Sequence, residues 1–209
     1  MVKKFGRALI ALCLLGGAST AAQAHVTECD WVAGHTTMPE RQAPGVAPNA
    51  IRWKGAIFAC ERDLAADPTN VHLMYTLGHA LYYNHPWQDR KRSIELIRAA
   101  AEKGHSQSHF VLGLFYSSGE LGEILPQNWC EGAKHHLIAA RWGRYASLIS
   151  YSRWALKGRY DSCKEPVDWQ EVAGFLDLAR GAAQYDWYDG LLIDDLEEQL
   201  APRLKAAKK

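Results

Sequence analysis

Residues 100–105 read AAEKGH and residues 110–119 read FVLGLFYSSG, and parts of both stretches recur along the chain. The Leu-Gly pair inside the second stretch also occurs at residues 77–78. The Ala-Ala-x-x-Gly pattern of the first stretch recurs at residues 139–143 and, in degraded form, at residues 182–186. Because the same marks return in the same order, the sequence predicts an internal repeat.

The spacing of these marks predicts that each repeat is a pair of helices. Asn84, Gly119 and Gly158 lie about 35 to 39 residues apart, the length of a two-helix unit. Asn and Gly tolerate the left-handed conformation in which helices often end, so we expect the first helix of each pair to end at these residues. A glycine inside a helix costs about 1 kcal/mol relative to alanine. We therefore expect Gly78 and Gly113 to lie where a second helix approaches closely.

These stretches resemble the Sel-one-like repeat, a longer relative of the tetratricopeptide repeat with the signature A-A-x-x-G…L-G-x-x-Y-x-x-G. The match covers residues 99–119 well and residues 71–98 in part. The resemblance implies an all-α fold, an α-solenoid in which about three helix pairs form a right-handed superhelix. It further implies a surface for protein contacts rather than an enzyme, and no cofactor is expected.

The repeats divide the chain into three parts. Residues 1–24 are predicted to be a signal peptide, residues 25–50 an extended arm tethered by a disulfide, and residues 51–205 the helical repeat domain. Within that domain, a helix over about residues 52–66 follows the arm. A helix over residues 191–204, limited by Pro202, is expected to close the array.

The first 24 residues have the features of a secretory signal peptide. Lys3, Lys4 and Arg7 precede an apolar run over residues 8–15, and Ala22-Gln23-Ala24 is a small-residue cleavage site. The apolar run is too short to span a bilayer. We predict cleavage near Ala24/His25 and a periplasmic or secreted protein without a membrane span; an uncleaved anchor is the alternative.

Four of the five cysteines follow the signal peptide. They are Cys29, Cys60, Cys130 and Cys163, and an even number in an exported chain predicts two disulfides. Three pairings are possible. We favour Cys29–Cys60 and Cys130–Cys163, because each joins neighbouring segments. A zinc site is the alternative, but the sequence contains no C-x-x-C pair.

Composition and motifs disfavour several classes of function. The chain has 24 Lys and Arg against 23 Asp and Glu, so it lacks the basic excess of an electrostatic nucleic-acid binder. No G-x-S-x-G, S-x-x-K, H-E-x-x-H or phosphate-binding glycine loop is present. His135 and His136 are adjacent on a predicted helix and point about 100° apart, so they do not readily share a metal ion.

One face of the predicted first helices is the candidate binding surface. With the Leu-Gly pairs as anchors, side chains from three repeats are expected to point into the concave face, either to contact a ligand or to pack in the core. They are His72, Tyr75, His79, Tyr82, Tyr83, Phe110, Leu114, Arg153 and Lys157. An aromatic and imidazole groove that ends in two cations suits an extended peptide or an acidic chain terminus.

These observations lead to one functional hypothesis and two alternatives. The leading hypothesis is a scaffold or adaptor that binds a protein or peptide partner in the cell envelope. An envelope enzyme acting on peptidoglycan or β-lactams is the main alternative. A glycan-binding module is the third, because all eight tryptophans follow the predicted signal peptide and indole rings can stack on sugars.

Overall fold

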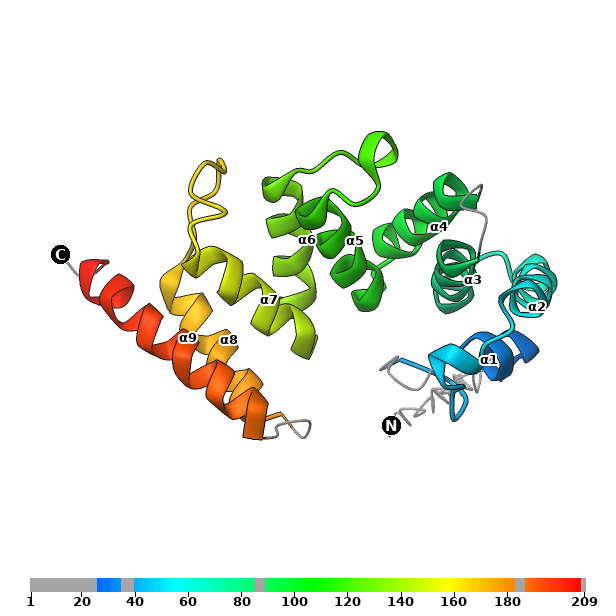
Figure 1. Ribbon diagram of the computed structural model, residues 1–209, viewed down its shortest axis with the longest axis horizontal. Coiled ribbons are helices and arrows are strands. Elements are labelled where there is room, and N and C mark those ends of the chain that lie inside the picture. Colours follow the sequence, from blue (N-terminus) through cyan, green and yellow to red (C-terminus); the bar gives the residue numbers. More distant parts are fainter. Residues whose placement is uncertain (1–25, 35–39, 85–88, 183–186, 208–209) are drawn as a thin grey trace, which may run out of the picture.

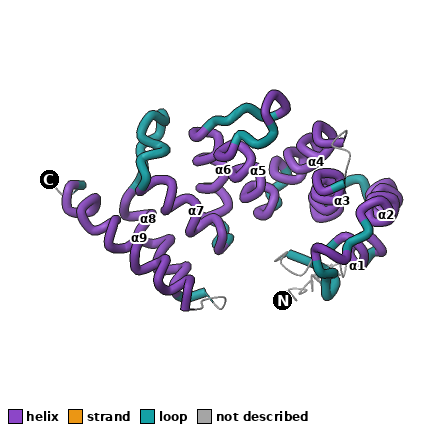
Figure 2. Tube along the Cα trace, in the orientation of Figure 1, coloured by secondary structure: helices purple, strands orange, loops and turns teal. Residues whose placement is uncertain are grey.

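A computed structural model describes residues 26–34, 40–84, 89–182 and 187–207, and every regular element in these ranges is helical (Figures 1 and 2). The all-α prediction is confirmed. The α-helices are α1 Glu28–Ala33, α2 Trp53–Ala66, α3 Val71–Tyr83, α4 Arg90–Glu102, α5 Ser106–Ser118, α6 Trp129–Arg141, α7 Tyr145–Leu156, α8 Trp169–Arg180 and α9 Trp187–Ala206. Two 3-10 turns, η1 Pro48–Ala50 and η3 Gly122–Ile124, lie between them.

The helices follow an arc, with α1 and α2 at one end and α9 at the other (Figure 1). Each helix packs mainly on its neighbours in the chain, most closely α3 on α4 and α5 on α6. The buried side chains accordingly form three clusters along the arc. One centres on Leu73 and Leu77, the next on Ile97 and Leu112, and the last joins α7, α8 and α9. The structure is therefore a serial, repeat-like packing of helix pairs.

The predicted close approaches at the two Leu-Gly pairs are confirmed. A Cβ atom on Gly78 would lie 2.8 Å from Cγ1 of Ile97, and one on Gly113 would lie 2.7 Å from Nδ1 of His136. Both distances are shorter than real Cβ contacts, so only glycine allows α4 and α6 to approach as they do.

The helix ends agree with the sequence in part. Gly119 ends α5 in the left-handed conformation, with φ 69°, and Gly158 follows α7 with φ 71°. The predicted helix end at Asn84 is also confirmed, since Asn84 is the C-cap of α3, but its φ of −73° is not left-handed. Asn70 begins α3 as a side-chain cap, because its Oδ1 accepts a hydrogen bond from the Leu73 amide over 3.1 Å.

The two disulfides are those predicted. Cys29–Cys60 joins α1 to α2, and Cys130–Cys163 joins α6 to the loop after α7. Two such bridges are typical of proteins that fold in an oxidising compartment, outside the cytosol. The predicted signal peptide itself, residues 1–24, lies outside the described residues.

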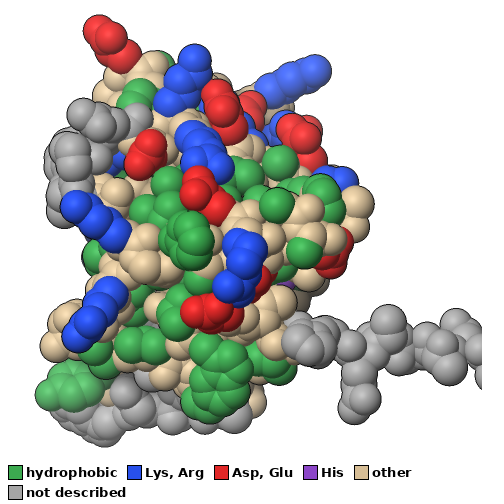
Figure 3. All heavy atoms as spheres, turned by 90° about the vertical axis from the view of Figure 1, so that its right-hand side faces the viewer, with side chains coloured by type: hydrophobic (Ala, Val, Ile, Leu, Met, Phe, Trp, Pro, Cys, Tyr) green, Lys and Arg blue, Asp and Glu red, His purple; other side chains and the backbone are tan. Residues whose placement is uncertain are grey.

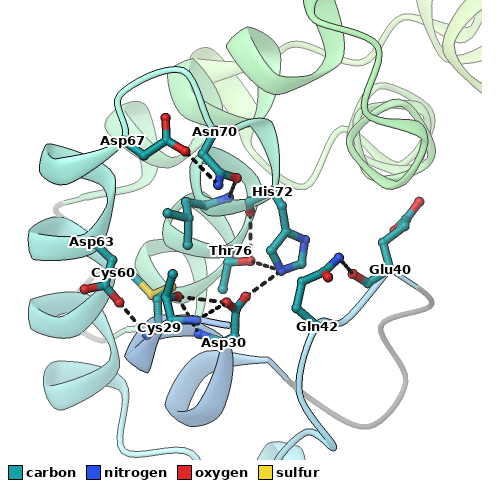
Figure 4. Close-up of polar contacts among 12 residues, drawn as sticks. Cys29, Asp30, Glu40, Gln42, Cys60, Asp63, Asp67, Asn70, His72 and Thr76 are labelled. Carbon is teal, nitrogen blue, oxygen red and sulfur yellow. Dashed lines mark hydrogen bonds and ion pairs between the residues drawn. A yellow bond between two sulfur atoms is a disulfide. The ribbon is translucent and has the colours of Figure 1, made fainter. Parts of the chain in front are cut away.

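The arm at residues 25–50 is not wholly extended, because residues 28–33 form α1. Thr27 and Asp30 make a capping box, in which each side chain bonds to the other residue's backbone amide. Asp30 then reaches α3, where its Oδ1 lies 2.9 Å from Nε2 of His72 (Figure 4). Figure 4 also shows Asp63 of α2, whose carboxylate accepts a hydrogen bond from the Cys29 amide. These contacts and the disulfide fix α1 on α2 and α3.

The last helix is longer than predicted, since α9 continues through Pro202 to Ala206. Two acidic residues of α9 form ion pairs with the preceding helix. Arg180 at the end of α8 donates to Asp194 over 2.7 Å and to Glu197 over 2.8 Å, which ties the two helices together.

No helix among the described residues is both long and apolar enough to cross a membrane. Figure 3 views the molecule from the α2 end, where Lys and Arg side chains alternate with Asp and Glu side chains and hydrophobic ones. This face shows no single-sign patch, consistent with the balanced charge of the chain.

Candidate functional site

A pocket of about 570 Å³ lies between α3 and α5, and we call it the α3–α5 pocket. Six of the nine residues predicted for the binding face line it: Tyr75, His79, Tyr82, Tyr83, Phe110 and Leu114. They meet because each helix repeats its apolar and aromatic side chains every three or four residues, which places them on one face. The sequence therefore predicted six of the thirteen residues that line this pocket.

Ring contacts hold the pocket wall in place. Tyr82 packs on Phe115 with ring centroids 4.9 Å apart, and Tyr83 stacks on Trp53 of α2 at 5.3 Å. Tyr83 is 48% exposed and Leu114 is 38% exposed, so a ligand can reach both without rearrangement of the core. An exposed Tyr on a rigid support is a side chain that commonly contributes to protein interfaces.

A polar chain forms the floor of the pocket. The hydroxyl of Tyr75 accepts a hydrogen bond from Nε2 of Gln107 over 3.2 Å, and Oε1 of Gln107 accepts one from Nε of Arg144 over 2.6 Å. The guanidinium of Arg144 also lies over the ring of Phe110, 5.1 Å from its centroid. The Gln107 side chain thus holds Arg144 against the pocket.

Arg144 is the cation of this pocket. Burial lowers its pKa, but an arginine remains protonated at neutral pH. None of the ion pairs between described residues includes Arg144. A partly buried positive charge without a carboxylate in contact favours an anionic ligand group.

Glu120 lies at another edge of the pocket. Its Oε1 accepts a hydrogen bond from the Tyr82 hydroxyl over 2.9 Å. Burial and this hydrogen bond to a carboxylate raise the pKa of Tyr82 to about 12, so the phenol keeps its proton at physiological pH. The guanidinium of Arg90 lies over the Tyr82 ring, 4.9 Å from its centroid.

Three predicted residues do not line the pocket. His72 is paired with Asp30 instead. Arg153 and Lys157 stack on the ring of Trp154 in and just after α7, at 5.5 and 5.2 Å from its centroid. The structure therefore supplies a different cation from the two predicted. Arg144 was missed because it is the N-cap of α7, outside the helical register on which the prediction relied.

A second hollow, of about 450 Å³, lies beside the Cys130–Cys163 disulfide. One of the cations that line it, Arg141, donates to both carboxylate oxygens of Glu171, over 2.7 and 3.0 Å. None of the nine residues predicted for the binding face lines this hollow, so the α3–α5 pocket is the better candidate site.

The histidines include one contact that the sequence did not suggest. Nδ1 of His109 on α5 lies 2.9 Å from Nδ1 of His135 on α6, a distance for one hydrogen bond between two neutral rings. Burial lowers the pKa of both, that of His135 to about 4. The described residues contain no group of three or more His, Cys, Asp or Glu side chains placed to hold a metal ion.

Comparisons with protein-family models, with curated proteins and with solved structures found no match to this chain.

Proposed function

We propose that this protein is an exported scaffold that binds an extended segment of a partner protein in the α3–α5 pocket. In this proposal the helix pairs are Sel-one-like repeats, and their stacking forms a right-handed α-solenoid. The sequence marks at residues 77–78 and 112–113 support this assignment, since both lie at the predicted helix contacts.

The observation that carries the proposal is the composition of the pocket. Exposed Tyr83 and Leu114 offer apolar contact area, and Arg144 offers a charge that forms no ion pair with a carboxylate of the described residues. Apolar anchors around one oriented polar group are the usual features of a peptide-binding groove. The two disulfides support export, and we propose a periplasmic or secreted location with residues 1–24 as the signal peptide.

The test compares pocket variants with matched variants elsewhere on the surface. Leu114→Arg introduces a charge into the pocket, and Leu178→Arg makes the same change at a side chain that is 59% exposed on α8. Tyr83→Ala is paired in the same way with Tyr188→Ala, where the tyrosine is 76% exposed. Each purified protein is used to capture partners from a cell-envelope extract of the source cells, and the captured proteins are quantified by mass spectrometry.

We expect a partner that the wild type and both controls retain and that each pocket variant loses at least tenfold. Equal capture by Leu114→Arg and Leu178→Arg would contradict the proposal. It would also be contradicted by turnover of nitrocefin or of muropeptides that a pocket variant abolishes, since that result would identify an enzyme.

A further inference from the structure

The segment after α1 returns to the first residue of α5. Glu40 Oε1 accepts a hydrogen bond from the hydroxyl of Ser106, 66 residues further along the chain. In Figure 4 the Glu40 side chain points away from Asp30 and toward the helices that follow α3. Ala43 is buried, and the Val46 amide donates to the Gly34 carbonyl over 2.7 Å. A short non-helical piece of the chain is thus laid on the helices, with Glu40 as its contact to α5.

Next to Glu40, His105 presents a buried donor without a partner. The Ser108 amide donates to Nδ1 of His105 over 3.3 Å, so in the neutral ring the proton is on Nε2. Burial lowers the pKa of His105 to about 4, which keeps the ring neutral. His105 is 7% exposed, and its Nε2 has no hydrogen-bond partner among the described residues. Buried donors are normally satisfied, so this one indicates a missing acceptor.

Glu40 does not supply the acceptor that His105 lacks. Its Oε2 is also buried without a hydrogen-bond partner among the described residues. Burial lowers the pKa of both His105 and Arg144, and the negative charge of Glu40 acts on both in the opposite direction. The ring of Tyr75 connects them, since it packs 4.9 Å from His105 and bonds to the Gln107 that holds Arg144. The carboxylate therefore lies in the field of the pocket cation without contacting it.

We propose that Ser106, His105 and Arg144 form a carboxylate site, which Glu40 fills only in part in the free protein, through Ser106, and which an acidic side chain of the partner segment fills in the complex. The site offers one hydroxyl, one ring N–H and one guanidinium, which together match the acceptors and charge of a carboxylate. The present occupant is a Glu side chain on a non-helical segment, and this argues for a Glu or Asp within an extended partner segment. Displacement of Glu40 then couples partner binding to release of residues 40–46.

This inference rests on the proposed function, and a peptide that copies the internal occupant tests it separately. The probe is the acetylated and amidated peptide ERQAPGVA, residues 40–47 of the chain. It is titrated to millimolar concentration into the full chain carrying Glu40→Gln and into the wild type. Binding is followed by the amide NMR shifts of Ser106 and His105, and the control peptide has Gln in place of Glu.

We expect the Glu peptide to bind the Glu40→Gln protein at least tenfold more tightly than the wild type, whose own Glu40 competes. The Gln peptide should bind neither protein. Equal binding of the two peptides, equal affinity for the two proteins or no shift at Ser106 and His105 would each overturn the inference.

Second-site variants test two of the three donors, the Ser106 hydroxyl and the Arg144 guanidinium. In the Glu40→Gln background, Ser106→Ala and Arg144→Gln should each lower the affinity for the Glu peptide at least fivefold. Arg159→Gln is the matched control, because that guanidinium stands over the ring of Trp129 at 5.1 Å and does not line the α3–α5 pocket. If Arg144→Gln fails to fold, Ser106→Ala carries the test, and full affinity in that variant contradicts the inference. If partner capture is lost in Leu114→Arg but unchanged in Ser106→Ala and Glu40→Gln, the scaffold function stands and the carboxylate site is wrong.

Discussion

The hairpins α3–α4 and α5–α6 use corresponding positions for their closest contact but place different side chains there. When the Ala-Ala pairs at 100–101 and 139–140 are aligned, Ile97 corresponds to His136. Each is the side chain that lies against the glycine of the preceding helix, Gly78 or Gly113. Both hairpins thus keep the glycine and the alanine pair, but the side chain that contacts the glycine is apolar in one hairpin and polar in the other.

That variation changes the energetics of the second hairpin. In the first hairpin, Ile97 is apolar and the Gly78 carbonyl accepts a hydrogen bond from the Ser93 hydroxyl over 2.6 Å. In the second, His136 is fully buried and neither ring nitrogen has a hydrogen-bond partner among the described residues. Burial lowers the pKa of His136 to about 4. The buried ring of His136 therefore lowers the stability of the second hairpin and makes that stability depend on pH. The first hairpin has no such group at the corresponding position.

The largest expected change in stability comes from placing a histidine in the first hairpin at the position that His136 holds in the second. Ile97→His should lower the free energy of unfolding by about 3 kcal/mol, because it removes buried apolar contacts and adds an unpaired polar ring. Urea unfolding at pH 7.5 measures this loss. Phe58→His, at a side chain that is 70% exposed on α2, is the control and should change stability little. A loss below 1 kcal/mol in Ile97→His would mean that the two hairpins tolerate imidazole equally.

Lowering the pH should reveal the same difference in the wild type. Below pH 6.5 an unfolded histidine gains a proton, whereas His136 in the folded protein stays neutral down to about pH 4. Because the unfolded state then binds more protons, stability is present above pH 6.5 and is lost as the pH falls toward 4. One such histidine accounts for about 1.4 kcal/mol per pH unit. His136→Ile should therefore lose roughly 2 kcal/mol less than the wild type between pH 7.5 and 5 in urea unfolding, and parallel losses would refute the assignment.

Making the second hairpin like the first should stabilise it. At pH 7.5, His136→Ile should raise the free energy of unfolding by about 1.5 kcal/mol, since it replaces an unsatisfied buried ring with an apolar side chain. Thermal unfolding followed by circular dichroism reports the change. A destabilised variant would show that the ring of His136 makes hydrogen bonds in solution.

The smallest expected effect on stability concerns Gly78, the contact glycine of the first hairpin. Gly78→Ala should cost about 1 kcal/mol net, because the new Cβ would meet Ile97 and the Ser93 carbonyl while helix propensity improves. Gly174→Ala on α8 has open space around it and should instead stabilise the protein by up to about 1 kcal/mol. Opposite signs in urea unfolding support close packing at Gly78, and a gain in both variants would refute it.

Local sequence patterns predicted much of this fold. The Leu-Gly and Ala-Ala-x-x-Gly marks located the helix pairs, and the cysteine spacing gave the correct disulfides. Helical periodicity also brought six predicted residues into one pocket. These features depend on neighbours within one helix or one hairpin, which a single sequence reveals.

Contacts between distant, non-periodic positions could not be predicted in this way. Glu40 meets Ser106 across 66 residues, and Arg144 meets Gln107 across 37. Both Glu40 and Arg144 lie outside helices, so no register indicates where their side chains point. The helix at residues 28–33 had a local signal, the Thr27 and Asp30 capping box, which the Pro- and Gly-rich composition of the rest of the arm obscured.

The central claim is that the α3–α5 pocket contacts a partner protein, and site-specific photocrosslinking in the source cells tests it most directly. A photoreactive benzoylphenylalanine replaces Leu114 in the pocket or, as the control, Leu178 on α8. We predict a light-dependent adduct with another protein from position 114 and none from position 178. No adduct at position 114, or the same adducts from both positions, would contradict the claim.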